Sequence, residues 1–487
     1  MRAWPAPTWR CPPTWCGSAS ASRRWTTCSR TSTRPLAEEL AVCVDFGSTF
    51  TKALLVDLTT GTLLAAAEHR TTIETDVLDG YDACLAELAR TEPRAGSAEV
   101  FACSSAGGGL RIAVVGNEEL VTAEAGRRVA LSSGGKVVAV RAVAQGHDLD
   151  LVADAPDVVL LTGGTDGGNT EVLLRAARTL ATSDWDGPVV VAGNIDARDE
   201  VGAILAGTPH VLADNVVPRI GVLAPASARA AIREVFLAHV IGGKHLSSRT
   251  SNGTNTFTAM VRGATPDVVL TGVELLATVA GEVVVVDVGG ATTDVHSVVE
   301  VDPEQGATEG GFARDVVAPT PVTRTVEGDL GMRWSAISTV EEAGLPELRA
   351  AAERRRADPG FLPSTDQEHD EDEAIATAAV GLALRRHAGR SKVVVSPEGR
   401  VVERTGVDLR EVHLVVGSGG VLRHGRAGVA DRVLGSSVGR DGDWQLPERA
   451  RVLVDADYVL AAAGLLAPDH PDAAYRLVAG LLDRLAP

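Results

Sequence analysis

The stretch Ala41-Val-Cys-Val-Asp45-Phe46-Gly47-Ser48-Thr49, followed by Phe50-Thr-Lys-Ala-Leu-Leu-Val-Asp57, decides the fold of this chain. An apolar run ends on an aspartate, and a turn of small residues leads into a second run. A polar turn at 58–61 and a third run from Thr62 to Ala67 follow. Apolar runs of this length, bounded by Gly, Ser and Thr, are typical of strands, so the stretch predicts a β-meander that starts from a central strand.

The same order of residues returns in the second half of the chain. Val283-Val-Val-Val-Asp287-Val288 precedes the turn Gly289-Gly290-Ala291, then a run from Thr292 to Val301 and a turn at 302–306. The alignment pairs Asp45 with Asp287, Gly47 with Gly289, Thr51 with Thr293, and Lys52 with Asp294. A single unit of this kind also occurs in ordinary β-hairpins, but its repetition favours a duplicated phosphate-binding element.

The residue types in these hairpins suit a nucleotide with its metal. Small residues in a turn let backbone N–H groups approach a phosphate, because no Cβ stands in the way. Mg²⁺ in nucleotide sites takes one or two carboxylates besides water and phosphate oxygens. We therefore predict that Asp45 and Asp287 face each other across a cleft, act in catalysis and hold Mg²⁺, directly or through water. The residues predicted to bind nucleotide or phosphate here are Gly47, Ser48, Thr49, Thr51, Lys52, Gly289, Gly290, Thr292, Thr293 and Asp294.

A third glycine-rich turn completes the set. Glu411-Val-His-Leu-Val-Val416 reads as a strand, and Gly417-Ser418-Gly419-Gly420 leads from it into a helix start at Val421-Leu-Arg423. A strand, a glycine turn and a helix are expected where a nucleotide lies against backbone. The turn lacks the lysine of a P-loop. We predict that Gly417, Ser418, Gly419 and Gly420 contact the nucleotide.

Composition restricts the class of protein. A length of 487 residues allows several domains, and 3% aromatic residues with 51 glycines favours aliphatic parallel strands covered by helices, hence an α/β fold. The net charge of −18 repels nucleic acid and anionic membranes, so we expect partners that are proteins or small molecules. No uncharged apolar run reaches the roughly 18 residues of a membrane span. The cysteines lack CxxC spacing and indicate a reducing, cytoplasmic setting.

The region between the hairpins predicts further βα units. Runs at 157–161, 188–192 and 210–212 read as strands separated by helical stretches, and the first is followed by the glycine-rich turn Thr162-Gly-Gly-Thr-Asp-Gly-Gly-Asn169. Such alternation is typical of a small doubly wound domain. The turn can bind a ligand or can simply join a strand to a helix.

The three glycine turns, in this order, resemble the motifs of the actin-like ATPase superfamily, which includes acetate and sugar kinases, heat-shock ATPase chaperones and actin. The resemblance implies a two-lobed fold of duplicated RNase H-like domains with a βα insertion. It makes Asp45 to Lys52 the phosphate-1 motif, Val285 to Val295 phosphate-2, and Val415 to Leu422 the adenosine motif. It also implies connecting helices at 267–280 and 455–466.

Longer strings resemble one family within that superfamily. They are Leu161-Thr-Gly-Gly-Thr-Asp-Gly-Gly-Asn169, Cys103-Ser-Ser-Ala-Gly-Gly-Gly-Leu110 and Arg324-Thr-Val-Glu-Gly-Asp-Leu-Gly-Met332. They resemble the MutL proteins associated with adenosylcobalamin-dependent glutamate mutase, which are unrelated to the mismatch-repair proteins of the same name. The resemblance implies a slow, Mg-dependent ATPase with ATP as its ligand, and a chaperone-like role as a reactivating factor for a cobalamin-dependent mutase.

These patterns predict a division of the chain into six parts. They are an extension or mis-assigned start at 1–37, a first lobe at 38–149, inserted βα units at 150–230, a linker and connecting helix at 231–281, a second lobe at 282–454, and C-terminal helices at 455–487 that return to the first lobe. The acid-free segment 1–37 is rich in Arg, Trp and Pro and is excluded from the fold. The inserted units or the charged stretch 353–373 are expected to contact the partner.

Two other functions stay open: a small-molecule kinase of the same fold, and a nucleotide-binding scaffold with negligible turnover. A kinase needs a positioned base, for which Asp166, Glu327 and Asp329 are the candidates. The histidines show no zinc spacing. The acidic run 366–373 lacks the order of an EF-hand and is expected to be a solvated loop.

Overall fold

Two five-stranded sheets of the same topology form the framework of the protein. The computed structural model describes residues 39–106, 110–116, 122–142, 151, 153–241, 246–247, 249–251, 255–300, 321–396, 399–404 and 406–483. The chain divides into Met1–Ala37 and Glu38–Pro487, and all that follows concerns the second unit. The predicted extension at 1–37 and the predicted turn at 302–306 lie outside the described residues.

The first sheet has the strand order β12-β4-β1-β2-β3, and the second has the order β15-β14-β13-β18-β19. In each, three consecutive strands form an antiparallel meander, a later strand pairs in parallel with the first of them, and a fifth strand pairs in parallel with that later strand. The strands of the first sheet are β1 (Leu40–Phe46), β2 (Phe50–Asp57), β3 (Thr62–Arg70), β4 (Glu99–Ser104) and β12 (Val261–Ala264). Those of the second are β13 (Val283–Val288), β14 (Thr293–Val298), β15 (Val322–Glu327), β18 (Leu414–Ser418) and β19 (Arg451–Val454). The predicted duplication of an RNase H-like domain in a two-lobed actin-like ATPase fold is confirmed.

Helices cover the outer face of each sheet. Helix α1 (Val77–Thr91) packs against β2 and β3 of the first lobe. In the second lobe the long helix α10 (Asp366–Ala388) crosses β13, β14 and β15. Shorter helices surround these: α6 (Phe257–Met260), α8 (Ala336–Glu342), α9 (Arg349–Ala357), α11 (Gly420–Arg423) and α12 (Val429–Val433). Two small hairpins lie outside the large sheets: β10 (Thr250–Ser251) with β11 (Asn255–Thr256), and β16 (Ser391–Ser396) with β17 (Gly399–Arg404).

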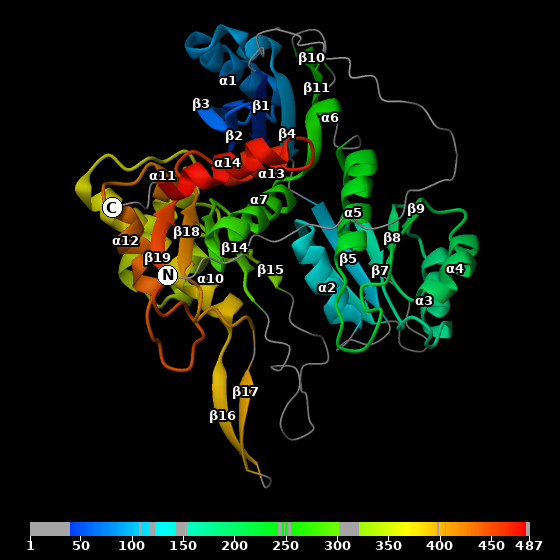
Figure 1. The fold of residues 1–487 in the computed structure, drawn as a ribbon. Helices are drawn as coiled ribbons and strands as arrows, with labels where there is room; N and C mark the ends of the chain where they lie inside the picture. The colour runs from blue at the N-terminus through cyan, green and yellow to red at the C-terminus, as the bar shows by residue number, and fades with distance from the viewer. Residues whose placement is uncertain are drawn as a thin grey trace, which may run out of the picture. The chain divides into compact units, whose positions relative to one another are not determined.

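Three helices pack together between the two sheets: α7 (Thr265–Ala280), α13 (Val459–Leu466) and α14 (Pro471–Leu482) (Figure 1). Their apolar side chains share one core with residues of both lobes. Along β1, Ala41 and Cys43 face this core while Val42 and Val44 face the other side of the sheet, as the period of two requires. Both predicted connecting helices are therefore present. Helix α13 begins at Val459 and not at 455, because the Asp455 carboxylate accepts hydrogen bonds from the first N–H groups of that helix.

A third, all-parallel sheet of order β6-β5-β7-β8-β9 forms the inserted domain. Its strands are β5 (Leu110–Gly116), β6 (Gly135–Ala142), β7 (Val158–Leu161), β8 (Val189–Val191) and β9 (His210–Leu212). Its helices are α2 (Thr122–Ser132), α3 (Glu171–Ala181), α4 (Arg198–Ile204) and α5 (Ala226–Val235). The insertion thus lies between β4 and β12 of the first lobe. It begins near 110 and not at 150, since β5 pairs with both β6 and β7. The sequence of a buried parallel strand does not show which sheet the strand joins.

The acidic run 366–373 is a helix and not the expected loop. Thr365 and Glu368 form a capping box that starts α10, and carboxylates in a first helical turn are favoured by the helix dipole. Asp372 pairs with the fully buried Arg355, and Glu373 pairs with Arg432. These arginines, supplied by other elements, explain why so acidic a segment is partly buried.

Candidate functional site

The turns of the two hairpins have the same backbone geometry. The N–H of Gly47 donates to the carbonyl of Phe50 at 3.1 Å, and the N–H of Gly289 donates to the carbonyl of Thr292 at 2.9 Å. A Cβ on Gly47 would lie 2.6 Å from the Phe50 oxygen, and one on Gly289 would lie 2.9 Å from that of Thr292. Both positions therefore require glycine.

The strand register around the turns agrees with the sequence alignment. Asp45 lies opposite Lys52 in the first hairpin, and Asp287 lies opposite Asp294 in the second. Ser48 is exposed, and Thr49, Gly290 and Thr292 are partly exposed, so the tips of both turns are accessible.

The third turn lies directly against the second hairpin. β18 runs parallel to β13, with Ser418 beside Asp287. Gly419 has a φ of 106°, and a Cβ there would lie 2.2 Å from the carbonyl oxygen of Val288. Gly417 is also confined, because a Cβ there would lie 2.5 Å from the side chain of Leu422. Gly420 then opens α11 with free space around it, so this turn brings bare backbone to the carboxyl end of the sheet.

Asp45 is buried and held from two sides. Thr265, the first residue of α7, donates its hydroxyl to Asp45 Oδ1 at 2.6 Å, and the Cys103 thiol lies 3.6 Å from the same oxygen. The other oxygen, Oδ2, lies 3.6 Å from the ammonium of Lys52. The helix that connects the lobes is thereby tied to the first aspartate of the site.

Lys52 lies where the charges of both hairpins meet. Its ammonium lies 3.4 Å from the centre of the Tyr458 ring, which receives the Arg423 guanidinium at 4.1 Å. Burial opposes the charge of Lys52, but Tyr458, Asp45 and Asp287 outweigh it and raise the pKa of the ammonium. Lys52 is therefore a fixed cation between the two lobes.

For Asp287, burial outweighs the favourable charge of Lys52. Burial raises the pKa of its carboxyl to about 6, and the nearby charges of Asp294 and Asp45 add to the effect, while Lys52 and a hydrogen bond from Ser418 oppose it. Asp287 thus lies close enough to Asp45 and to Asp294 to be repelled by both. An added cation would relieve this repulsion.

Other predicted residues support the turns from within the lobes. The hydroxyl of Thr51 hydrogen-bonds to Thr71 at 3.2 Å, and that of Thr293 donates to the carbonyl of Leu330 at 3.1 Å. Both threonines are fully buried. Their expected role as phosphate donors stays a prediction.

The candidate bases are engaged in structural contacts. Glu327 and Asp329 both pair with Arg386, which keeps the pKa of Asp329 low. Asp166 accepts hydrogen bonds from Asn215 at 2.8 Å and from the N–H of Ile195 at 3.2 Å, inside the inserted domain. These contacts give each of the three carboxylates a structural role.

The sequence did not reveal four residues of the site. Thr265 and Cys103 hold Asp45, Tyr458 covers Lys52, and Arg423 reaches Glu68 of the first lobe at 3.2 Å. No local sequence pattern marks these residues; in the structure, Tyr458 stands out by its φ of 58°, which is unusual for a residue other than glycine. Strained backbone of this kind is found preferentially at functional sites.

Two broader properties complete the description. In the parts of the chain that the structure describes, no three His, Cys, Asp or Glu side chains gather as a metal cage. Asp45 and Asp287 supply carboxylates, the ligand type that Mg²⁺ in a nucleotide site takes besides water and phosphate oxygens. No helix within the described ranges is both long enough and apolar enough to cross a membrane.

Comparison with known proteins gives consistent matches along the chain. The sequence model of the family described as MutL protein matches residues 41–482. Protein MutL of Clostridium tetanomorphum is 36% identical over 465 residues, which cover 89% of this chain and 97% of that protein.

Two solved structures are similar at lower levels. Nucleotide-free acetone carboxylase, solved for the mechanism of ATP-dependent acetone carboxylation, is 15% identical with a TM-score of 0.39, over 88% of this chain and 70% of its own. Nucleotide-free diol dehydratase-reactivating factor is 12% identical with a TM-score of 0.35, over 89% of this chain and 100% of its own. At such scores neither structure bears on the fold, which rests on the matched topology of the two sheets.

Proposed function

The chain belongs to the MutL protein family, and from this premise we propose that it binds ATP with Mg²⁺ and uses it to maintain or reactivate a partner enzyme. The observation that carries the proposal is the meeting of Asp45, Lys52 and Asp287 beside the turns of two matched hairpins. Glycine backbone for phosphates and carboxylates for a hydrated cation are the two requirements of such a site.

Each part of the proposed nucleotide site has a role in this proposal. Asp45 and Asp287 hold the hydrated metal, and bound Mg²⁺ would neutralise charge on the β and γ phosphates. The N–H groups of Gly47 and Gly289 are used inside their turns, so we assign the phosphate contacts to the N–H groups of the residues that follow them. The backbone of 417–420 supports the adenosine. Lys52 offsets the negative charge that remains.

The connecting helices provide a path from nucleotide to partner. A γ-phosphate held by both hairpins favours a closed arrangement of the lobes, and its loss on hydrolysis removes that preference. Because Thr265 of α7 holds Asp45, movement of this helix follows the site directly. Slow hydrolysis by water then resets the protein.

The partner we propose is an adenosylcobalamin-dependent mutase of the glutamate mutase type, in the cytoplasm. The family resemblance supports this class of partner. Radical mutases can retain damaged cobalamin, which leaves only when the protein opens. An ATPase with different affinities for opened and closed mutase would promote that exchange.

The alternatives are a small-molecule kinase and a scaffold without turnover. A kinase needs a base beside the γ-phosphate, and the three candidate carboxylates have structural partners. This favours the accessory ATPase over the kinase.

ATP turnover of the purified protein, measured with and without a cobalamin-dependent mutase, tests the proposal. We expect slow basal turnover that the mutase stimulates, together with recovery of mutase activity. Phosphorylation of a small metabolite would support the kinase, and binding without turnover would support the scaffold.

A further inference from the structure

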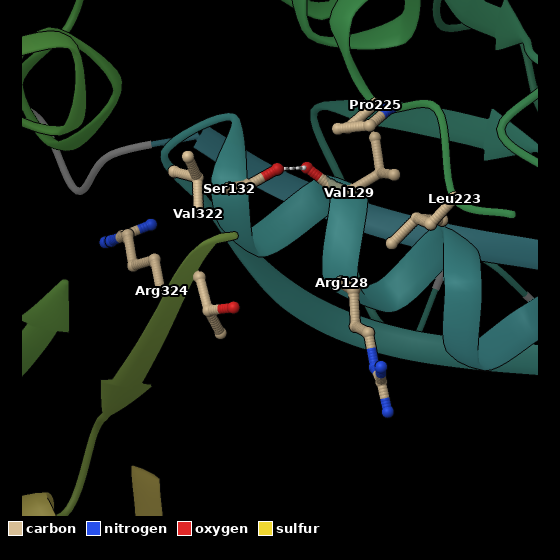
Figure 2. Close-up of a pocket in the computed structure, with 8 residues that line it drawn as sticks. Arg128, Val129, Ser132, Leu223, Pro225, Val322 and Arg324 are labelled. Atoms are coloured by element: carbon tan, nitrogen blue, oxygen red, sulfur yellow. Dashed lines mark hydrogen bonds between the residues drawn. The ribbon is translucent and has the colours of Figure 1, made fainter. Parts of the chain in front are cut away.

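The inserted domain contacts the second lobe beside the phosphate-2 hairpin. Helix α2 of the inserted domain packs against β15, which is hydrogen-bonded along its length to β14. Figure 2 shows Val322 and Arg324 of β15 next to the last turns of α2, where Val129 and Ser132 lie. One side chain, that of Arg324, makes polar contacts to both sides of this junction.

Arg324 is buried, with 5% of its surface exposed. Its Nη1 donates to the carbonyl of Leu131 at 2.8 Å, and its Nη2 donates to Oδ2 of Asp294 at 3.0 Å. Leu131 lies in the last turn of α2, where carbonyls lack helical partners and the helix dipole is negative. Asp294 is the residue opposite Asp287 in the phosphate-2 hairpin. A single planar guanidinium therefore joins the inserted domain to the candidate nucleotide site.

The contact between Arg324 and Asp294 leaves some of their polar atoms without hydrogen bonds. Among the described residues, Asp294 Oδ1 and Arg324 Nε are buried without a hydrogen-bond partner. A buried polar atom without a hydrogen-bond partner raises the free energy of the folded state. A new partner, or a shift in the orientation of the Asp294 carboxylate or the Arg324 guanidinium, would lower it. The free Asp294 oxygen belongs to a carboxylate close enough to Asp287 to raise the pKa of Asp287.

A second anchor of the inserted domain provides a comparison. Arg229 and Arg233 of α5 pair with Asp267 of α7 at 3.3 Å and 2.6 Å, and Arg229 also pairs with Glu274 at 2.9 Å. Both arginines hold the inserted domain to the connecting helix. Neither Asp267 nor Glu274 belongs to a phosphate turn.

We propose that Arg324 is a positioning residue that couples the occupancy of the phosphate-2 turn to the placement of the inserted domain. The inference rests on the proposed nucleotide binding at Asp45, Lys52 and Asp287. A cation and phosphate bound at Asp287 draw the Asp294 carboxylate toward them and weaken its hold on Arg324. The guanidinium, and with it the carboxyl end of α2, then changes its position. By linkage, a ligand that displaces the inserted domain changes nucleotide affinity by the same factor.

Hydrogen exchange of the full-length protein, with and without a non-hydrolysable ATP analogue and Mg²⁺, tests the coupling. We expect the analogue to change exchange in α2 by about fivefold or more in the unaltered protein, the lower end of typical allosteric coupling. Arg324→Met should abolish that response. Arg324→Lys keeps the charge without the two-pronged geometry, and it should fold, bind the analogue and show little response. The matched variant Arg229→Gln should loosen α5 but leave the response of α2 intact.

Direct titration of a fluorescent ATP analogue into the same proteins separates the possible outcomes. If the unaltered protein binds the analogue and both Arg324 variants respond as it does, the coupling is wrong while the proposed function stands. If Arg229→Gln abolished the exchange response of α2 as well, the coupling through Arg324 would also be wrong, because loosening the inserted domain at either anchor would then be enough to remove the response. If the unaltered protein binds no nucleotide, the proposed function fails and the coupling with it.

Discussion

Lys52 determines the charge balance of the candidate site at the level of single residues. Its ammonium offsets two carboxylates from opposite hairpins, and both Lys52 and Asp45 are largely withdrawn from water. A buried carboxylate that loses its partner is strongly destabilising, whereas the intact pair adds little net stability.

Replacing Lys52 with Met should therefore lower the free energy of unfolding of the ligand-free protein by about 3 kcal/mol. Urea denaturation measures the effect, and Mg²⁺ with ATP should restore part of the loss. The control is Lys136→Met, which removes an exposed lysine from β6 and should change the free energy of unfolding by less than about 0.5 kcal/mol. Equal losses in the two variants would contradict the proposed role of Lys52.

Two buried histidines make stability depend on pH. Burial lowers the pKa of His387 to about 3, and its ring bridges Ser297 at 2.8 Å and Thr325 at 3.0 Å. Burial and the charges of Arg324, His387 and Arg229 lower the pKa of His296 well below its usual range.

In the unfolded chain a histidine is protonated as the pH falls below about 6.5. In the folded protein His387 stays neutral down to about pH 3. The stability contribution of each neutral ring is present above pH 6.5. It is lost as the pH falls, by about 1.4 kcal/mol per unit per histidine. His387→Gln should reduce proton uptake on unfolding by nearly one proton between about pH 5.5 and 4.5, where the unfolded ring is almost fully protonated, as measured by urea midpoints. A slope identical to that of the unaltered protein would show that the ring is protonated in the fold.

The residues of the site differ in how far the sequence could reveal them. Asp45, Asp287 and Gly419 were predicted, because an aspartate or glycine at the end of an apolar run is a local pattern. Tyr458 and Arg324 were missed, since their partners Lys52 and Leu131 are distant in sequence and only tertiary packing brings them together. Contacts of this kind leave no periodicity.

In the proposed function, movement of the lobes depends on the connecting helices. A Cβ on Gly272 of α7 would lie 2.0 Å from the carbonyl oxygen of Leu460, and one on Gly464 of α13 would lie 1.9 Å from that of Val268. The two helices thus cross through a reciprocal pair of glycines with their backbones in close contact. Even a methyl group would force them apart.

Gly464→Ala should therefore destabilise the protein by about 1–3 kcal/mol, the usual cost of overpacking, and slow ATP turnover. The matched control is Gly480→Ala in α14, where a Cβ meets nothing within 4 Å and helix propensity makes alanine neutral or stabilising. Calorimetric midpoints and turnover rates measure both variants. If they behaved alike, close packing of α7 on α13 would not be what holds the lobes.

The elements themselves were largely predicted from sequence, and the errors have physical reasons. The three glycine turns and the strands of the inserted sheet at 158–161, 189–191 and 210–212 follow from apolar runs and turn residues. The start of α10 was predicted as a loop because its carboxylates look solvated. Their arginine partners, Arg355 and Arg432, come from separate elements, and sequence patterns do not show such pairing.

At the scale of the whole molecule, the question is which surface meets the partner. Both stretches proposed from sequence present an exposed apolar side chain: Ile220 in the inserted domain, 80% exposed, and Leu362 in the second lobe, 74% exposed. The stretch 353–373 also contains buried Arg355 and Asp372, so its deletion would damage the second lobe. Single substitutions are the cleaner comparison.

If the inserted domain contacts the proposed mutase partner, Ile220→Asp should weaken that binding by at least about tenfold, because apolar anchors dominate most interfaces, and Leu362→Asp should leave it unchanged. Neither substitution should alter basal ATP turnover. Surface plasmon resonance on the intact proteins measures the affinities. The reverse result would place the partner on the second lobe.

The most direct test of the central claim is calorimetric titration of ATP and Mg²⁺ into the full-length protein and into Asp45→Asn and Asp287→Asn. We predict magnesium-dependent binding at one site in the unaltered protein and at least about a tenfold loss in each variant, since each removes a carboxylate from the metal-phosphate site. Unchanged nucleotide affinity in both variants would contradict the assignment of Asp45 and Asp287, with the turns of their hairpins, to the ATP site.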